Sequence, residues 1–170
     1  MMKKRIFITL IAGFLLGACG YISQPTVPMY GGYAYQKSEK YNTNGEQIYF
    51  TAVDKNGQYI AYTGGPNTGG MMMRSSYLSC ASCHGNDGQG GTHYMHMQVM
   101  DAPAITYTAL IDMKREDSGG TPTEYSLDDL RGVVVEGHDT AGDILDRNMP
   151  RWQMNDDDLA DLLIFLKTLP

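Results

Sequence analysis

The sequence predicts a mostly α-helical domain of a few helices with one inserted loop or small hairpin. Three observations predict it. A helix-capping pattern begins at Asn44, leucines recur at helical spacing from Leu159 to Leu169, and a C-x-x-C-H motif occupies residues 80–84 between them. Residues 53–79, which separate the first helix from this motif, form the insertion. A chain of 170 residues is long enough for one domain with a single core.

The N-terminus is typical of an export signal. Three basic residues precede an apolar run, residues 6–16, that is shorter than the roughly 20 residues of a membrane span. The run ends in Leu-Gly-Ala-Cys, which resembles a bacterial lipobox. We therefore expect residues 1–18 to be cleaved and Cys19 to be lipidated, so that an exported protein is anchored to a membrane in the periplasm or at the cell surface. The alternative is an ordinary signal peptide that leaves Cys19 as a free thiol.

A flexible tether is expected between this anchor and the domain. Residues 19–43 are rich in Tyr, Gly, Gln, Ser and Pro and show no helical or strand periodicity, and the domain itself spans residues 44–170. The formal net charge of −6 becomes −9 when the three basic residues of the signal are removed. An acidic surface argues against binding to nucleic acid or to anionic lipid, and it permits attraction to a basic partner protein.

The first helix and the insertion have local signals. Asn44 is a candidate N-cap, and Gln47 three residues later completes a capping-box pattern. In the insertion, Asn56 and Gly57 precede the alternating segment 59–62, which predicts a tight two-residue hairpin turn. Residues 71–73 are three consecutive methionines. We interpret them as filler of an irregular apolar surface, with copper binding as the alternative.

The C-x-x-C-H motif is typical of covalent haem attachment. Its two thiols lie one helical turn apart, where they can bond the two vinyl groups of a haem, and His84 supplies an imidazole to the iron. A redox dithiol or half of a zinc site is the alternative reading of Cys80 and Cys83. A zinc site would need a second ligand pair, and no cysteine follows. With Cys19 carrying lipid and both Cys80 and Cys83 bonded to haem, no cysteine is left to form a disulfide within the mature chain.

Helix-capping residues and helix-breaking glycines predict the remaining helices and loops. Residues 85–91 and 112–122 are glycine-containing or polar and are expected to be surface loops. A helix is expected from the capping pattern at Ser126 to a stop at Gly137. The final helix starts after the N-cap Asn155, and three aspartates in its first turn suit the helix dipole. Its leucine face is expected to pack against the first helix.

From about Asn44 to Pro170 the chain resembles the class I, monohaem c-type cytochromes. The resemblance rests on residues 45–50, 80–85, 101–105 and 148–152 and on the closing leucine-rich helix. It implies a fold of a few helices around one covalent haem c, in which the last helix crosses the first and a late methionine binds the iron. The insertion is a departure, because the family usually has only a few residues there.

The resemblance also implies residues that contact the haem. The carbonyl of Pro103 is expected to accept a hydrogen bond from the free ring nitrogen of His84, which fixes the ring orientation, and Ile105 belongs to the same cofactor-binding segment. A simple loop proline is the alternative. Trp152 either donates its N–H to a haem propionate or is an ordinary core aromatic residue.

Met149 is the expected distal ligand of the iron. It lies on an irregular segment before the final helix, and Pro150 biases its backbone toward an extended form. His93 and His96 are the alternatives, and either would give a bis-histidine iron of lower potential.

Ligation by His84 and Met149 leaves no open position on the iron and raises its reduction potential. The expected function is therefore that of an electron carrier, not of an enzyme, that passes single electrons between membrane or periplasmic redox proteins. Two other classes stay open. One is a haem enzyme or gas sensor with open or bis-histidine iron, and the other is a copper-handling protein that uses the clusters at 71–73 and 93–97.

Overall fold

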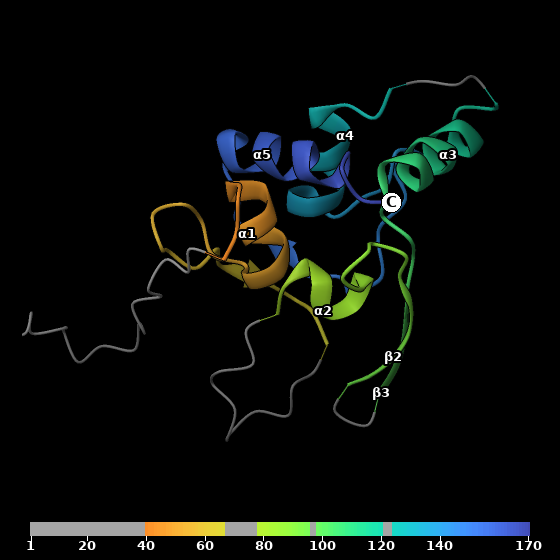
Figure 1. Cartoon of the computed structure of the whole chain (residues 1–170). Helices are drawn as coiled ribbons and strands as arrows, with labels where there is room; N and C mark the ends of the chain where they lie inside the picture. Colours follow the sequence, from red (N-terminus) through yellow and green to blue (C-terminus); the bar gives the residue numbers. More distant parts are fainter. Residues whose placement is uncertain (1–39, 67–77, 96–97, 121–123) are drawn as a thin grey trace, which may run out of the picture. The chain divides into compact units, whose positions relative to one another are not determined.

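The computed structural model describes residues 40–66, 78–95, 98–120 and 124–170 (Figure 1). All of them belong to the second of two units of the chain, Tyr33–Pro170. The predictions for the export signal, Cys19, nearly all of the tether, the methionines 71–73 and His96 lie outside the described residues. Within those residues helices predominate, and two short antiparallel strand pairs accompany them.

Two helices from opposite ends of the domain form the centre of the core. α1 (Asn44–Thr51) packs against α5 (Asp156–Leu166), as the sequence predicted. Their backbones approach closely at Gly45, where a Cβ atom would lie 1.9 Å from the carbonyl oxygen of Asp161. A residue with a side chain would therefore force the helices apart. The most deeply buried side chains of the pair are Ile48, Tyr49, Leu159 and Leu162.

The N-cap of α1 is Thr43, and the prediction of Asn44 was wrong by one residue. The hydroxyl of Thr43 accepts a hydrogen bond from the N–H of Glu46 at 3.1 Å. The amide of Asn44 donates instead to Asp158 at 2.9 Å and to Asp161 at 2.8 Å. Asn44 thus serves the contact with α5, a tertiary role that the local capping pattern does not reveal.

The cap of α5 is the predicted one. The side chain of Asn155 accepts a hydrogen bond from the N–H of Asp158 at 2.9 Å. Met154, just before the cap, and Leu159, in the first turn, are both buried, in the arrangement of a hydrophobic staple. The start of α5 is therefore fixed on both its polar and its apolar side.

The helix predicted after Ser126 is also present. Ser126 caps α4 (Leu127–Arg131) through a hydrogen bond from the N–H of Asp129 at 3.2 Å. The chain continues as a π-helical turn, η1 (Gly132–Glu136), and stops at Gly137, whose φ of 83° is left-handed. α4 contacts α5, and η1 contacts the segment that precedes α5.

The polar segment expected to be a loop at 112–122 is helical as far as Asp117. α3 (Tyr107–Asp117) is capped by Thr106, whose hydroxyl accepts from the N–H of Ala109. An ion pair of 2.5 Å between Asp112 and Arg115 lies along the helix. The prediction was wrong because α3 buries little more than Leu110, so its composition resembles that of a surface loop.

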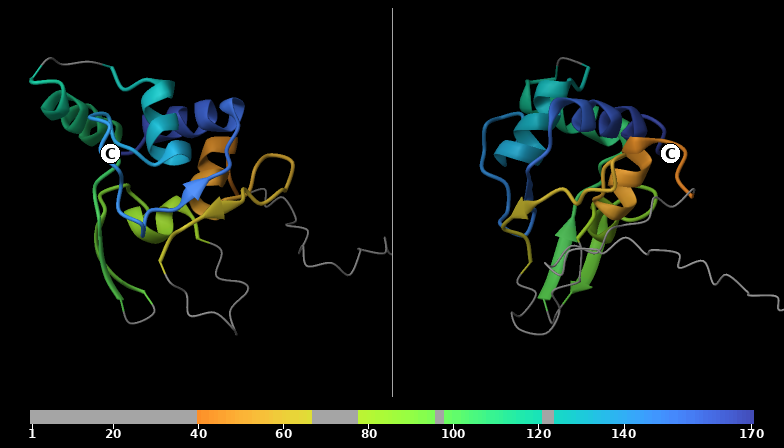
Figure 2. Two further views of the ribbon diagram at one scale, coloured as in Figure 1. Left: turned by 180° about the vertical axis from the view of Figure 1, so that it is seen from behind. Right: turned by 90° about the vertical axis from the view of Figure 1, so that its left-hand side faces the viewer.

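The inserted segment contributes a strand with a distant partner. The main-chain N–H of Asp54 donates to the carbonyl of Gln58 at 2.9 Å, so a tight turn lies close to the expected place. The following strand, β1 (Tyr62–Thr63), pairs antiparallel with β4 (Arg151–Trp152), which lies just before α5 (Figure 2). The insertion is thus bonded to the C-terminal part of the domain.

A second strand pair was not predicted. β2 (Gly91–Met95) and β3 (Gln98–Ala102) form an antiparallel hairpin in which His93 lies opposite Met100 and Tyr94 opposite Val99. Side chains of neighbouring strand residues point to opposite faces. Met100 is buried, whereas Tyr94 and Val99 are exposed, so the His93 face of the hairpin is the inner one.

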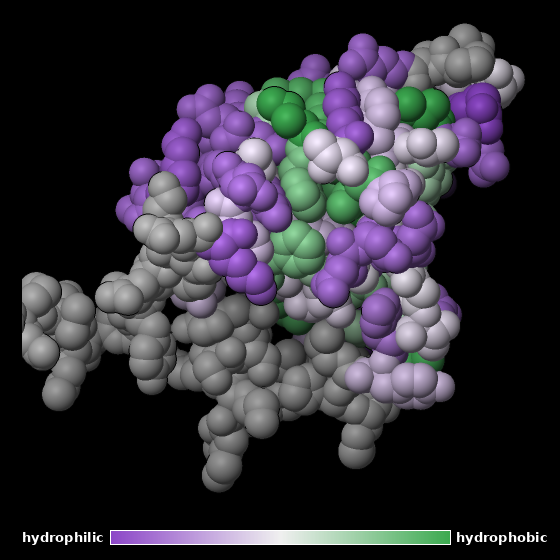
Figure 3. All heavy atoms as spheres, in the orientation of Figure 1, coloured by the Kyte–Doolittle hydropathy of each residue, from purple (hydrophilic) through white to green (hydrophobic). Residues whose placement is uncertain are grey.

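The surface of the described part is largely polar. Hydrophilic residues cover much of the face in Figure 3, with apolar residues exposed in patches between them. None of the helices in the described ranges is long and apolar enough to cross a lipid bilayer.

Candidate cofactor site

The short helix α2 (Cys80–His84) presents the two thiols and the imidazole of the C-x-x-C-H motif. The N–H of Ser79 donates to the hydroxyl of Ser82 at 3.1 Å, and the two serine hydroxyls lie 2.9 Å apart. Ser82, one of the two residues between the cysteines, therefore caps the helix on which they lie. Both cysteines are free thiols and half-buried.

The environment of the two thiols keeps them protonated. Burial raises the pKa of Cys80 to about 12, and the neighbouring Cys83 also raises it. Burial likewise raises the pKa of Cys83. A redox dithiol depends on a thiol whose pKa is lowered. Nor do the described residues contain a group of three or more His, Cys, Asp or Glu side chains that could hold a metal ion. The redox-dithiol and zinc readings therefore find no support.

His84 is arranged as a metal ligand. Its side chain is buried, with 6 % of the residue exposed, and Nδ1 lies 2.9 Å from the carbonyl oxygen of Pro103, the contact expected from the sequence. A carbonyl oxygen only accepts, so Nδ1 carries the hydrogen and Nε2 keeps a free lone pair. Burial lowers the pKa of His84, as does nearby His93, against the opposing effect of the Pro103 hydrogen bond. The imidazole is therefore neutral, the form that binds metals.

The loop after α2 folds back and is hydrogen-bonded to His84. The N–H of Gly90 donates to the carbonyl of His84 at 2.9 Å, and the N–H of Ile105 donates to the carbonyl of Gly88 at 2.7 Å. Ile105 is half-buried and packs against the core. The pairing of Ala102 with Gly91 before Pro103 and the bond of Ile105 after it hold the Pro103 carbonyl at the imidazole.

Tyr49 links the first helix to the motif. It is fully buried in α1, and its hydroxyl donates to the carbonyl of Gly85 at 2.6 Å, directly after His84. Burial raises the pKa of Tyr49 above its usual range, so the phenol stays a hydrogen-bond donor. The end of α2 is thereby attached to the centre of the core.

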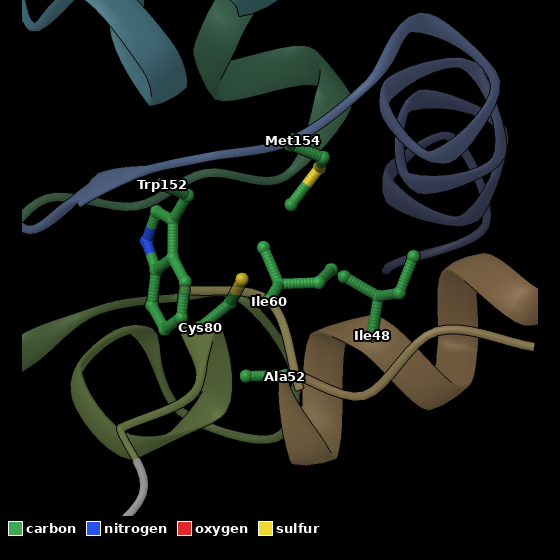
Figure 4. Close-up of a pocket in the computed structure, with 6 residues that line it drawn as sticks. All are labelled: Ile48, Ala52, Ile60, Cys80, Trp152 and Met154. Carbon is green, nitrogen blue, oxygen red and sulfur yellow. The ribbon is translucent and has the colours of Figure 1, made fainter. Parts of the chain in front are cut away.

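One wall of a small apolar cavity, too narrow to hold a water molecule, is formed by Cys80 (Figure 4). The other walls come from α1, from the insertion and from the segment before α5. They are formed by Ile48, Ala52, Ile60, Trp152 and Met154. Ligand pockets are usually about 300–1,000 Å³, so this cavity is not itself a pocket for a group as large as a haem.

The residues present fit a covalently bound haem. Two thiols one turn apart suit its two vinyl groups, and a neutral imidazole with a free Nε2 suits its iron. The apolar side chains around one thiol suit the edge of a tetrapyrrole. Haem chemistry thus agrees with the ligand set, the protonation states and the apolar surroundings.

Met149 and Met154, the two methionines near the site, have different environments in the structure. Met154 is buried, with 7 % of the residue exposed, and its side chain points into the cavity that contains Cys80 (Figure 4). Met149 is half-buried on the loop before β4 and is not one of the cavity-lining residues. The sequence predicts Met149 as the distal ligand, and the structure adds Met154 as a second methionine near the site. The position of Met154 just before the N-cap of α5 could have predicted that the residue is buried, but not that its side chain points toward Cys80.

Trp152 is a core aromatic residue that also lines the cavity. Only 4 % of it is exposed, and its ring lies 4.9 Å from that of Tyr62 in the insertion. The sequence did not predict this contact, because the two residues are far apart along the chain.

His93 lies in the neighbourhood of His84. It is close enough to lower the pKa of His84, and its Nε2 atom is buried without a hydrogen-bond partner among the described residues. Tyr94, the next residue, is 83 % exposed on the opposite face of the hairpin. Neighbouring residues of the His/Met cluster thus point in different directions.

A family model described as Cytochrome c matches residues 73–170. No curated protein and no solved structure matches the chain. The matched range begins shortly before the C-x-x-C-H motif and includes Pro103, Met149 and the final helix.

Proposed function

This chain belongs to the cytochrome c family, and from that premise we propose that it carries single electrons on one haem bound by His84 and Met149. The family implies a covalently attached haem c, and Cys80 and Cys83 are the residues that would hold it. The observation that carries the proposal is the buried, neutral His84 with its Nδ1 hydrogen bonded to Pro103.

Each residue of the site has a definite task in this proposal. A bound haem supplies an iron centre that accepts and releases one electron. The Pro103 carbonyl orients His84 and increases the basicity of its Nε2. The two thiols would bond the vinyl groups, and the apolar side chains around Cys80 would keep water from the haem edge. Buried surroundings of this kind influence the reduction potential.

Met149 is the proposed ligand opposite His84, and Met154 is the competitor. Met154 belongs to the hydrophobic core and packs beneath the start of α5, so binding iron would remove it from that packing. Met149 lies on a loop, and Pro150 favours an extended backbone there.

An iron with both axial positions filled by the protein has no position for substrate, so we propose an electron carrier and not an enzyme. Its partners are redox proteins, and the acidic chain favours attraction to a basic partner. The buried Nε2 of His93, which has no hydrogen-bond partner among the described residues, is an observation that favours the bis-histidine alternative. Nothing in those residues favours copper handling.

Optical spectra and potentiometry of the holoprotein test this function. We expect low-spin spectra in both oxidation states, one haem mass per chain, and a single one-electron transition in a potentiometric titration. The reduced protein should not bind carbon monoxide on mixing. A high-spin ferrous spectrum with rapid carbon monoxide binding would instead identify an open iron, as in an enzyme or sensor.

We also propose that the mature protein is anchored by lipid at Cys19 after export. The supporting observations are the basic start, the short apolar run and the small residues before the cysteine. Cys19→Ser should move the protein from the membrane to the soluble fraction and leave its haem content unchanged. Equal fractionation of both proteins, with no lipid mass on either, would contradict the anchor.

A further inference from the structure

We propose that Arg151 and strand β1 of the insertion are positioning elements that hold the Met149 loop, residues 145–149, and so keep the methionine sulfur available to the iron. This inference rests on the proposed function, because it takes Met149 as the distal ligand. It concerns contacts that the family resemblance did not predict, since β1 lies in the insertion.

Arg151 bonds main-chain carbonyls at both ends of the Met149 loop. Its Nη2 donates to the carbonyl of Leu145 at 2.8 Å, and its Nη1 donates to the carbonyl of Met149. Nη1 also lies 3.5 Å from the carbonyl of Asp146, a longer contact. Hydrogen bonds from a charged donor are the stronger kind, and the planar guanidinium presents several in fixed directions. One half-buried side chain therefore closes the loop.

The path of the Arg151 side chain is itself fixed. A Cβ atom on Gly137 would lie 1.7 Å from Nε of Arg151, so the side chain passes directly against the end of η1. The N–H of Leu145 donates to the carbonyl of Gly137 at 3.0 Å. The start of the Met149 loop is thus bonded to the same glycine over which the arginine passes.

β1 and its neighbours hold the chain on both sides of Met149. Before it, the carbonyl of Arg147 accepts from the N–H of Gly65 at 3.0 Å. After it, Trp152 pairs with Tyr62, and the N–H of Gln153 donates to the carbonyl of Ala61 at 2.7 Å. The insertion therefore spans the loop from one flank to the other.

These contacts have a consequence for ligand exchange. A thioether is a neutral ligand that competes with water and with added anions, and it stays bound only while its loop holds it close. Restricting the loop raises the effective concentration of the sulfur at the iron. Loss of the restraint should therefore speed replacement of Met149 without altering the His84 side.

The test is the rate at which cyanide binds to the ferric holoprotein, together with the sulfur-to-iron absorption band. Arg151→Gln and Tyr62→Ala should each increase the rate at least about tenfold, which corresponds to about 1.4 kcal/mol. The sulfur band should also fade on heating well before the protein unfolds. Arg151→Lys keeps the charge but not the planar donors, so its rate should be intermediate.

Two matched variants serve as controls. Arg115→Gln removes an arginine that pairs with Asp112 on α3, and Tyr94→Ala removes an exposed tyrosine on β2. Both should bind cyanide at the wild-type rate. If Arg151→Gln does not fold, Tyr62→Ala alone decides, because it leaves every Arg151 bond in place. Rates within twofold of wild type in the folded variants would overturn the inference.

Met149→Ala separates this inference from the proposed function. If that variant keeps the wild-type spectrum, Met149 is not the ligand and both proposals fail. If it opens the iron to cyanide while Arg151→Gln and Tyr62→Ala do not, only the positioning role is overturned.

Discussion

The two sides of the proposed haem site are built in different ways. On the histidine side, a contiguous motif on α2 places both thiols and His84, and short bonds from Tyr49 and to Pro103 fix it. On the methionine side, Met149 lies on a loop that is held by Arg151 and by β1. The bonds of the first arrangement join residues at most 36 positions apart, whereas the second joins segments about 90 residues apart.

Because of this difference, we expect haem attachment to depend on one side of the site and ligand exchange at the iron to depend on the other. The histidine side is rigid because helix, hydrogen bonds and burial all restrain the same few residues. The methionine side depends on a few bonds to main-chain carbonyls, any of which can be weakened without disturbing α2. We therefore expect substitutions to divide into those that abolish haem attachment and those that change only ligand exchange or stability.

The largest effect is expected from the two cysteines. Cys80→Ala combined with Cys83→Ala should abolish covalent attachment, because no other thiol lies in α2. Acid–organic extraction should then strip all haem, whereas the wild type keeps its colour. Haem that extracts fully from the wild-type protein would refute covalent attachment.

A smaller but substantial effect is expected at Gly45, where α1 and α5 meet. In Gly45→Ala the new Cβ would lie 1.9 Å from a main-chain oxygen, so the helices must separate. Overpacking of this kind costs about 1–3 kcal/mol, and we expect the upper end because backbone must move. Thermal unfolding measures the loss. A variant as stable as the wild type would show that the helix contact adapts freely.

Tyr49→Phe tests the histidine side alone. The phenylalanine keeps the packing but leaves the carbonyl of Gly85 without its donor, which should cost about 1 kcal/mol in chemical denaturation. Cyanide binding at the iron should not change, in contrast to Arg151→Gln. Faster cyanide binding in Tyr49→Phe would mean that the two sides are coupled.

A similarly small effect, which depends on pH, is expected at Asp129, whose side chain completes the capping box at the start of α4. Burial by itself would raise the pKa of Asp129, but hydrogen bonds from Lys114 and Ser126 outweigh it and lower the pKa. Its stabilising effect is therefore present above the ordinary carboxyl pKa and is lost as the pH falls through the lower folded value.

The stabilities of the wild type and of Asp129→Asn are compared by thermal unfolding at several pH values between about pH 5 and about pH 3. Asp129→Asn should lower stability by about 1 kcal/mol at the upper pH, and the difference from wild type should narrow as the pH falls. A difference that does not vary with pH would assign the effect to packing and not to charge.

The sequence predicted the histidine side far better than the methionine side, for a physical reason. The C-x-x-C-H motif, the Ser126 and Asn155 caps and the leucine face of α5 are local patterns, and each is present. The roles of Asn44 and Tyr62 depend on partners more than 80 residues away. No local pattern encodes such partners.

The predictions for α3 and for the β2–β3 hairpin failed for a reason other than distant partners. α3 was read as a loop because an exposed helix has the polar composition of a loop. The β2 and β3 hairpin was missed because its inner face carries His93 and Met100, a pair that does not produce a clear alternation of apolar and polar residues. In both cases the hydrophobic pattern was weak because little of the element is buried.

The central claim, that Met149 and not Met154 completes the iron coordination, is tested most directly by the ferric sulfur-to-iron band in two variants. Met149→Ala should lose the band, lower the reduction potential and bind cyanide rapidly. Met154→Ala should keep the band and lose stability, by about 2–5 kcal/mol for a buried methionine. A band that disappears in Met154→Ala and persists in Met149→Ala would contradict the account and move the ligand to the cavity beside Cys80.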